Sequence, residues 1–573
     1  MYKLTLFIFL LLSTPSFGQE WQFNYSKKLD SKLKRKIERQ TNFYFNTQTF
    51  IHQIYLQCAE HGYITADISI KDSVVFVQLG RKYNWLLIDY DETASFWIKR
   101  QGLQKAWKNS VIKPAQFKFQ MEELLGALHE NGYPMAKIRL DSIDLSDSSI
   151  SGRVIIEQGA FIEFGKIQNL GGLSIAPSYI YGVIDIKPGD KFQMSKWKLI
   201  DTRLQEIYFS KFIQPSKYKI TRSKLDIDLF LDEKKVNIFQ GIVGYQTSEN
   251  QAQGSFTGDF SMKIYNSMQY GSLFGLDWRG FAGGGQIADL EFEYPYIGGL
   301  DIGLNYALNF QRFDTSFLNV HQQFGINYLF SLRNRIFIGF DQESSVLIEV
   351  PVEQIKSSNQ LPSQLDQRSN GYFIKYLFSS ANDEILFKKG LKISFNSKLY
   401  RTTFLQNEMI LNIEDDTDFS SAYDSLQTKE NIRTNLKAQW AVSLDKKSVL
   451  IPCFTIGHNL NENLLINETF LIGGMSTLRG FDEQSIRLSD YAIAVLSYHY
   501  YFQYNSSLEL FSNYALGTML NNKQTQEFLG FGLAMHIGME NGKFSLSYAL
   551  GRQNDNPILV RNAKFHFGYI QNL

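Results

Sequence analysis

The C-terminal part of the chain alternates large apolar residues with small or polar ones for about ten residues at a time. From Leu300 to Phe310, the even positions are apolar and the odd positions are Asp, Gly, Asn or Ala. The pattern recurs from Leu529 to Met539 and from Phe544 to Leu550. Because successive side chains of a strand point to opposite faces, each segment has one apolar face and one small or polar face. Strands of this length and polarity are typical of a transmembrane β-barrel with lipid outside and a wet lumen.

About sixteen such strands are expected between residues 235 and 573. Their predicted starts lie near residues 237, 254, 267, 285, 300, 316, 334, 370, 390, 431, 448, 490, 506, 527, 543 and 562. Short turns alternate with longer connections, and the longest loops fall at 347–369, 408–430 and 459–488. This asymmetry is the rule for outer-membrane barrels, whose turns are short on the periplasmic side. An even number of strands brings both ends of the barrel to that side.

The first 18 residues have the layout of a secretory signal peptide. Lys3 precedes an apolar run from Leu4 to Leu12, and Ser16-Phe17-Gly18 offers a cleavage site before Gln19. The apolar run is too short to form a stable transmembrane helix. We therefore expect residues 1–18 to direct export of the rest of the chain.

The region between the signal and the barrel contains internal repeats. Segments Ile54–Ile70 and Leu124–Leu140 align without gaps, share the pattern Glu-x-Gly-Tyr, and each follow a helical apolar pattern and precede a strand. A degenerate third copy has a helix around Ile200–Tyr208 and an alternating strand from Leu225 to Leu231. We predict three small α+β domains, at 19–80, 81–158 and 159–234. Arrays of this kind bind partners along exposed sheet edges.

Basic residues are concentrated between positions 27 and 39. They surround Leu29, Leu33 and Ile37, which recur at a spacing of four. One interpretation is the first helix of the first repeat, with a solvated basic face. The other is a helix that contacts anionic lipid head groups. We favour the first interpretation.

Composition excludes several classes of protein. Lys and Arg total 58 against 57 Asp and Glu, so the formal net charge of the 573-residue chain is only +1. A nucleic-acid-binding protein would carry a basic excess, and we expect no such partner. The two cysteines, Cys58 and Cys453, cannot form a disulfide framework or a metal site by themselves.

The sequence contains no pattern typical of an enzyme. Gly283-Gly284-Gly285 lacks the following Lys and hydroxyl residue of a phosphate loop, and Gly474-Met475-Ser476 lacks the frame of a nucleophile elbow. The eight histidines are scattered without a His-Glu-x-x-His pattern. We therefore predict no catalytic residues, no cofactor and no metal site.

One motif within the loop at 459–488 connects these features to a family. It reads Gly473-Gly474-Met475-Ser476-Thr477-Leu478-Arg479-Gly480-Phe481. A loop with an aliphatic-Arg-Gly-Phe tetrad, after exported repeats and ahead of the last barrel strands, resembles the BamA/TamA family of outer-membrane assembly proteins. The resemblance covers residues from about 20 to 573. It implies that the repeats are POTRA domains and that the barrel, of the bacterial surface antigen type, has sixteen strands.

The resemblance also implies a role for the tetrad Leu478, Arg479, Gly480 and Phe481. Arg479 would fold back into the lumen and pair with an acid on a neighbouring strand, since its guanidinium binds carboxylates in a bidentate fork and stays charged. Where the family has Phe-x-Asp-x-Gly, this chain reads Phe511-Ser512-Asn513-Tyr514-Ala515. The candidate partners are therefore Glu509 and Asn513, which share one strand face.

The favoured function is that of an outer-membrane assembly factor, which inserts or translocates other β-barrel proteins by strand pairing at the barrel seam. The first strand, with Gly241 and Gly244, must close against the last strand, with Gly568, and glycine weakens a strand interior. An open seam would pair with strands of unfolded outer-membrane clients.

The implied location is the outer membrane of a Gram-negative bacterium, with the repeats in the periplasm. Outer-membrane lipids are another expected partner, and accessory lipoproteins or an inner-membrane protein are further candidates. The alternative is a two-partner-type secretion pore, in which the basic helix at 27–39 would plug the lumen.

Overall fold

A computed structural model describes residues 22–571 except for short segments, of which the longest are 39–46, 247–254, 382–386 and 414–418. The predicted signal peptide at 1–18 lies outside the described residues. The chain divides into two compact units. The first runs to Lys166 and includes 188–198 and 219–226, and the second comprises 167–187, 199–218 and 227–573.

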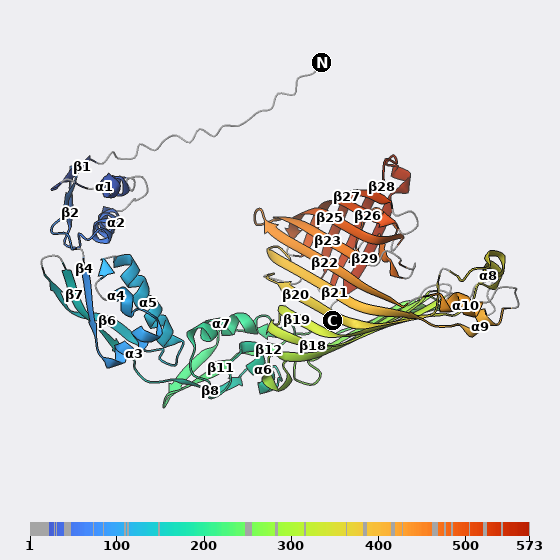
Figure 1. Cartoon of the computed structure of the whole chain (residues 1–573), viewed down its shortest axis with the longest axis horizontal. Coiled ribbons are helices and arrows are strands. Elements are labelled where there is room, and N and C mark those ends of the chain that lie inside the picture. The colour runs from blue at the N-terminus through green and yellow to red at the C-terminus, as the bar shows by residue number, and fades with distance from the viewer. Residues whose placement is uncertain are drawn as a thin grey trace, which may run out of the picture. The chain divides into compact units, whose positions relative to one another are not determined.

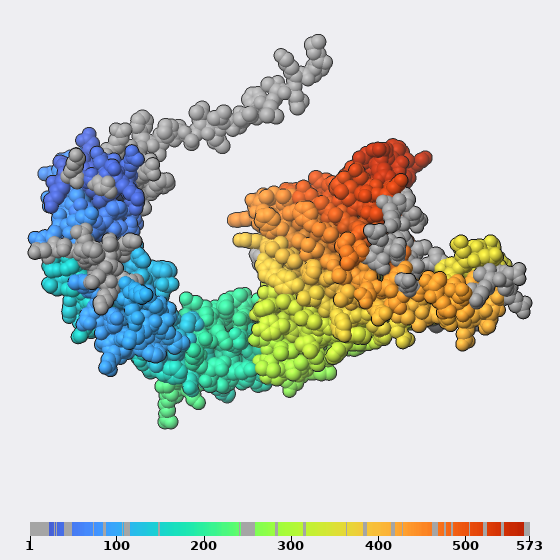
Figure 2. All heavy atoms as spheres, in the orientation of Figure 1, coloured from blue at the N-terminus to red at the C-terminus, as the bar shows by residue number. Residues whose placement is uncertain are grey.

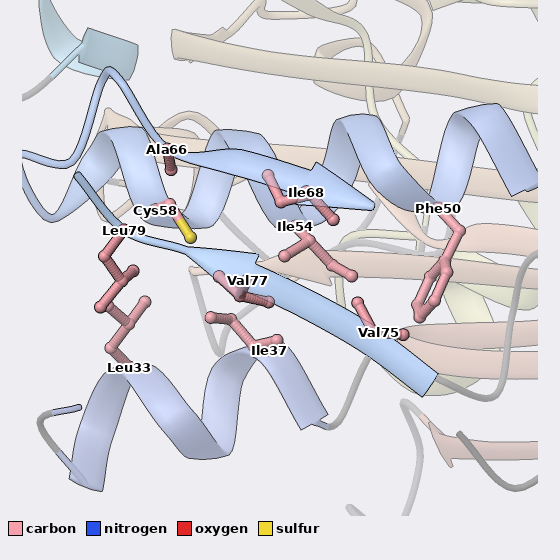
Figure 3. Packing of buried hydrophobic residues seen from close by; sticks show 10 residues of the cluster. All are labelled: Leu33, Ile37, Phe50, Ile54, Cys58, Ala66, Ile68, Val75, Val77 and Leu79. Atoms are coloured by element: carbon pink, nitrogen blue, oxygen red, sulfur yellow. The ribbon is translucent and has the colours of Figure 1, made fainter. Parts of the chain in front are cut away.

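The first repeat is a three-stranded sheet covered by two helices (Figure 1). Its elements are β1 (Gln22–Tyr25), α1 (Ser31–Glu38), α2 (Thr47–Glu60), β2 (Asp67–Lys71) and β3 (Val74–Gln78). The sheet order is β1-β3-β2, with β1 parallel to β3. Figure 3 shows Leu33 and Ile37 of α1 facing the sheet, among the ten buried residues of the core. The helix with the basic face therefore packs as the first helix of this repeat.

The second repeat has a four-stranded sheet with the order β5-β4-β7-β6. Its elements are β4 (Trp85–Tyr90), α3 (Glu92–Arg100), α4 (Gln104–Trp107), β5 (Ser110–Val111), α5 (Pro114–His129), β6 (Lys137–Leu145) and β7 (Ser149–Glu157). Trp97 and Trp107 lie in its core beside Leu124 and Leu128. The apolar helix face predicted from the sequence thus contacts the sheet.

The third repeat contributes two small sheets, β10-β11-β8 and β12-β9. Its elements are β8 (Glu163–Asn169), α6 (Pro177–Ile184), α7 (Met194–Leu204), β9 (Ser210–Phe212), β10 (Lys217–Thr221), β11 (Lys224–Leu229) and β12 (Leu231–Glu233). Leu225, Ile227 and Leu229 are buried, as their alternation predicts.

The C-terminal region is one antiparallel sheet of 17 strands in sequential order, from β13 to β29. The strands are β13 (Ile238–Gln246), β14 (Ser255–Tyr265), β15 (Leu273–Gly280), β16 (Gln286–Tyr294), β17 (Ile302–Phe313), β18 (Phe317–Ser331), β19 (Asn334–Leu347), β20 (Gln367–Ser379), β21 (Gly390–Phe404), β22 (Lys429–Ser443), β23 (Ser448–Asn459), β24 (Phe470–Ile472), β25 (Ile486–Gln503), β26 (Ser506–Met519), β27 (Thr525–Met539), β28 (Gly542–Gln553) and β29 (Lys564–Gln571). β24 has three residues and pairs with β25 alongside β23, so the other sixteen described strands build the barrel wall. This confirms the predicted fold.

One predicted strand start was wrong by six residues. β15 begins at Leu273, not near 267, because the preceding residues form a turn. Asn266, Gln269 and Gly271 have φ angles of 58°, 64° and 70°, which a strand cannot contain. Two short 3-10 helices, η2 (Ile297–Gly299) and η4 (Val560–Asn562), lie in other connections.

The two faces of the barrel strands differ in the way that the alternation predicts. On β26, Leu508, Leu510 and Tyr514 are exposed, whereas Glu509 and Asn513 are buried on the inner face. Large apolar side chains on the outer face suit contact with lipid. None of the described helices is long and apolar enough to cross a membrane.

The long loops predicted at 347–369 and 408–430 contain short helices. These are α8 (Val352–Ser358), α9 (Glu408–Leu411) and α10 (Phe419–Asp424). Ile355, Ile410 and Phe419 meet in one small apolar core, which joins the two loops. In Figure 2 this part projects beyond the strands at the right, in yellow and orange. The loops therefore fold together rather than separately.

Within the second unit, α6 of the third repeat contacts two short turns of the barrel. Tyr179 and Tyr296 are both 2% exposed, and their rings form an edge-to-face pair with centroids 5.7 Å apart. Gly271 lies against the Tyr179 ring, where a Cβ atom would overlap it. The main-chain amide of Ala176 donates to the carbonyl of Gln269 at 2.7 Å. These contacts fix α6 to the short-turn end of the barrel.

Candidate functional site: a loop anchored inside the barrel

The loop between β23 and β25, residues 460–485, carries the tetrad. It begins its turn at Gly473 and Gly474, whose φ angles are 117° and 87°, and Gly480 has a φ of 100°. These positive φ values are ones that residues with a Cβ atom rarely adopt. Thr477 closes the turn, because its hydroxyl donates to the Gly473 carbonyl at 2.8 Å and accepts from the Gly473 amide at 2.8 Å.

Arg479 lies against the inner faces of β25 and β26. Its Nη1 donates to Oε1 of Glu509 at 2.8 Å, and its Nη2 donates to Oγ of Ser497 at 3.2 Å. Its guanidinium carbon lies 3.5 Å from the centroid of the Phe511 ring, within the range of a cation–π interaction. The side chains of Arg479 and Glu509 are only 14% and 6% exposed. Two opposite charges are thus paired where water is scarce, which makes the pair sensitive to loss of either partner.

Asn513 also contacts Arg479, but through the main chain. Its Nδ2 donates to the Arg479 carbonyl at 2.8 Å. An ionised aspartate at this position could only accept hydrogen bonds, so the amide of asparagine suits this contact. Both sequence-predicted partners therefore meet Arg479, Glu509 at the side chain and Asn513 at the carbonyl.

The other residues of the tetrad make close apolar contacts. Leu478 is fully buried in a cluster that includes Leu488 and Phe528. The Phe481 ring packs edge to face on Phe528, with centroids 5.6 Å apart. A Cβ on Gly480 would lie 2.7 Å from the Leu550 carbonyl, so only glycine fits there. The loop is thus held by an ion pair, a main-chain hydrogen bond and an apolar cluster.

Two histidines that were not predicted from the sequence contact the same carboxylate. His536 Nε2 lies 3.0 Å from Oε2 of Glu509, and His499 Nε2 lies 3.8 Å from its Oε1. They are brought together by strand register, because His499 pairs directly with Glu509 and His536 lies two residues beyond Ala534, which pairs with Glu509. The short turns at both strand junctions were the available signal, since a short turn fixes the pairing of the strands that it joins.

The three seam glycines lie in the first and last strands. Gly241 and Gly244 pair with Phe260 and Thr257 on β14, and Gly568 pairs with Ser545 on β28. In the part of the chain that the structure describes, the sheet begins at β13 and ends at β29, and these two strands are not paired with each other. As far as the structure describes them, β13 has 9 residues and β29 has 8, whereas β21 has 15.

Known proteins share this architecture over most of the chain. Residues 279–570 match the Omp85 superfamily domain. No curated protein matches the chain. CdiB from Acinetobacter baumannii has a TM-score of 0.54 at 13% identity, over 95% of this chain and 99% of CdiB. CdiB from Escherichia coli has a TM-score of 0.50 at 12% identity, with the same coverage of 95% and 99%. BamA from Haemophilus ducreyi lacking POTRA domains 1–3 has a TM-score of 0.46 at 14% identity, over 85% of this chain and 98% of BamA.

Proposed function

This chain belongs to the Omp85 superfamily of outer-membrane proteins, as its tetrad and repeats led us to expect, and from that premise we propose that it assembles other β-barrel proteins in the outer membrane. The observation that carries the proposal is the unpaired arrangement of β13 and β29 among the described residues. Unpaired backbone groups within a bilayer cost several kcal/mol each. A strand of an unfolded client can satisfy them, so that each client hairpin is added at the seam.

Strand length supports the same mechanism. Within the described residues, the strands at the seam have 9 and 8 residues against 15 in β21, so we infer a shorter apolar wall beside the seam. A short apolar wall is matched by a thinner bilayer, which lowers the barrier for a client to insert. No nucleotide is required, because the folding of the client supplies the driving force.

The second repeat offers an edge for clients before they reach the seam. β6 is an edge strand of its sheet, and Ile143 and Leu145 near its end are 59% and 43% exposed. An unpaired edge with exposed apolar side chains suits strand addition by an unfolded chain. With the repeats in the periplasm, this edge would receive clients and accessory proteins there.

Two observations favour assembly over the secretion pore. The helix that would have served as a plug, α1, places Leu33 and Ile37 in the core of the first repeat. The loop that carries the tetrad is anchored to the inner wall by Arg479, on the side of the strands where a substrate would pass.

Client folding in liposomes tests the proposal. The purified full-length protein is reconstituted, an unfolded outer-membrane barrel is added, and protease-protected client is followed over time. We expect faster folding than in empty liposomes and a loss of about tenfold or more in Arg479→Ala, which corresponds to about 1.4 kcal/mol. Arg401→Ala is the control, since Arg401 is exposed on β21. No acceleration by folded protein, together with a large single-channel conductance, would reject assembly and support the pore.

A further inference from the structure

Three side chains with metal-binding atoms converge on the inner wall of the barrel. His499, Glu509 and His536 come from the adjacent strands β25, β26 and β27 (Figure 1). One ligand atom of each lies within 4.8 Å of the others. Glu509 and His536 are buried, and His499 is partly buried. The register of these three hydrogen-bonded strands fixes the backbone positions of His499, Glu509 and His536 relative to one another.

The ligand types are those of zinc. Two imidazole nitrogens and one carboxylate oxygen form the His₂Glu set, which binds Zn²⁺ at about 2.0–2.2 Å and leaves the fourth position open. His536 Nε2 and Glu509 Oε2 are 3.0 Å apart, and small rotations of both side chains accommodate an ion between them. The rings of His499 and His536 are stacked, with an interplanar angle of 26° and centroids 5.9 Å apart.

Ser545 orients one of these ligands. Its Oγ lies 2.9 Å from Nδ1 of His536. A serine hydroxyl donates or accepts, so it serves either tautomer of the ring. When it accepts from Nδ1–H, the Nε2 lone pair is directed at the cluster, which is the arrangement that metal-binding histidines normally have.

Arg479 and a zinc ion would compete for the same carboxylate. Arg479 occupies Oε1 of Glu509, and His536 approaches Oε2. Two cations held by one carboxylate in a poorly hydrated wall repel each other strongly. We propose that His499, Glu509 and His536 form a Zn²⁺ site and that zinc binding displaces Arg479 from Glu509. Among the described residues, the Arg479 guanidinium then retains its contacts with Ser497 and Phe511, and the Arg479 carbonyl keeps Asn513, so zinc loosens the anchored loop without freeing it. The site stands on the barrel geometry and does not depend on assembly activity.

Calorimetric titration of the folded full-length protein with ZnCl₂ in detergent tests the site. We expect one Zn²⁺ per chain, and a loss of about tenfold or more in affinity for His499→Asn and for His536→Asn. His458→Asn is the matched control, because His458 pairs with Asp490 on the same barrel but belongs to no such cluster among the described residues. Heat-shifted gel mobility verifies that each variant is folded. No saturable binding, or equal binding by the His499→Asn/His536→Asn double variant, would overturn the proposal.

The Arg479→Ala variant distinguishes a zinc site that competes with Arg479 from nonspecific binding of zinc to the protein surface. Removal of the competing guanidinium should tighten Zn²⁺ binding by about tenfold or more, whereas Arg401→Ala should leave it unchanged. With Co²⁺ as the probe, the visible absorption of a four-coordinate ion should appear in the wild type and be lost in His536→Asn. Unchanged zinc affinity in Arg479→Ala would overturn the competition.

Discussion

The guanidinium of Arg479 and the carboxylate of Glu509 are 30 residues apart in sequence and 2.8 Å apart in the barrel lumen. The other carboxylate oxygen faces His536 at 3.0 Å. Glu509 thus connects the loop to three neighbouring strands through one side chain. This arrangement makes the inner wall and the loop a single structural unit.

Arg479→Ala should destabilise the folded barrel by about 3 kcal/mol, since removal of one partner leaves a buried charge without compensation. Arg479→Lys should lose less stability, because lysine keeps the positive charge opposite Glu509. It should still be less stable than the wild type, because lysine cannot contact Glu509 and Ser497 at the same time as the guanidinium does. Urea unfolding followed by tryptophan fluorescence measures both variants. A double-mutant cycle with Glu509→Gln should give a coupling energy above about 1 kcal/mol. Additive effects would show that the pair does not hold the loop.

Gly530→Ala should displace the loop without touching any charged group. A Cβ at position 530 would overlap the Arg479 carbonyl, which also accepts from Asn513. We expect a loss of about 1–3 kcal/mol, as for other overpacked sites, and faster protease cleavage within 460–485. Gly126→Ala on α5 is the control, because a Cβ there meets nothing within 4 Å. Equal protease resistance of the two variants would contradict the close contact.

The alternation of the sequence was sufficient to predict the barrel, and the tetrad was sufficient to locate the loop. Local periodicity reports which face of a strand is apolar. The starts of the wall strands were therefore predicted to within a few residues, and β15 is the exception. The histidine cluster was missed because His499 and His536 are distant in sequence and meet Glu509 only through the register of three strands. The helices α8, α9 and α10 were missed for a similar reason. Their apolar residues are buried against each other across two loops, which no single segment reveals.

Tyr296→Ala should release α6 from the barrel. Tyr296 is 2% exposed and packs edge to face on Tyr179, so the truncation removes a buried ring and should cost about 3–5 kcal/mol. Tyr270→Ala is a matched control, since Tyr270 is 39% exposed and lies in the neighbouring turn. Limited trypsin digestion should cleave the third repeat from the barrel faster in Tyr296→Ala only. If both variants resist equally, the junction is not held by this pair.

Cys58 reports the packing of the first repeat. It is fully buried on α2, and burial raises the pKa of its thiol to about 11. In a Cys453→Ser background at pH 8, maleimide labelling should be at least about 100-fold slower in the folded protein than in urea, because the thiolate is the reactive form. Leu33→Ala on α1 should accelerate labelling about tenfold or more by opening the core, and exposed Lys34→Ala should not. Equal rates for these two variants would mean that α1 does not belong to this core.

Glu206 lies between α7 and β9, beside Ser331 and Arg333 of the barrel. It makes the stability of this junction between the third repeat and the barrel depend on pH. Burial raises the pKa of its carboxyl above the ordinary value of 4.5, although a hydrogen bond from Ser331 and the charges of Arg333 and Arg203 act in the opposite direction. A carboxyl whose pKa is higher in the folded state is more easily ionised after unfolding. Stability from this group is therefore complete below pH 4.5 and falls as the pH rises through the folded pKa.

Glu206→Gln should remove that loss while keeping a side chain that can accept from Ser331. The variant and the wild type should have equal urea midpoints below pH 4.5, and the variant should be the more stable at pH 7.5. Exposed Glu233→Gln is the control and should change neither value. A variant that is less stable than the wild type at pH 7.5 would mean that Arg333 and Arg203 outweigh burial, and that the ionised carboxylate holds the junction.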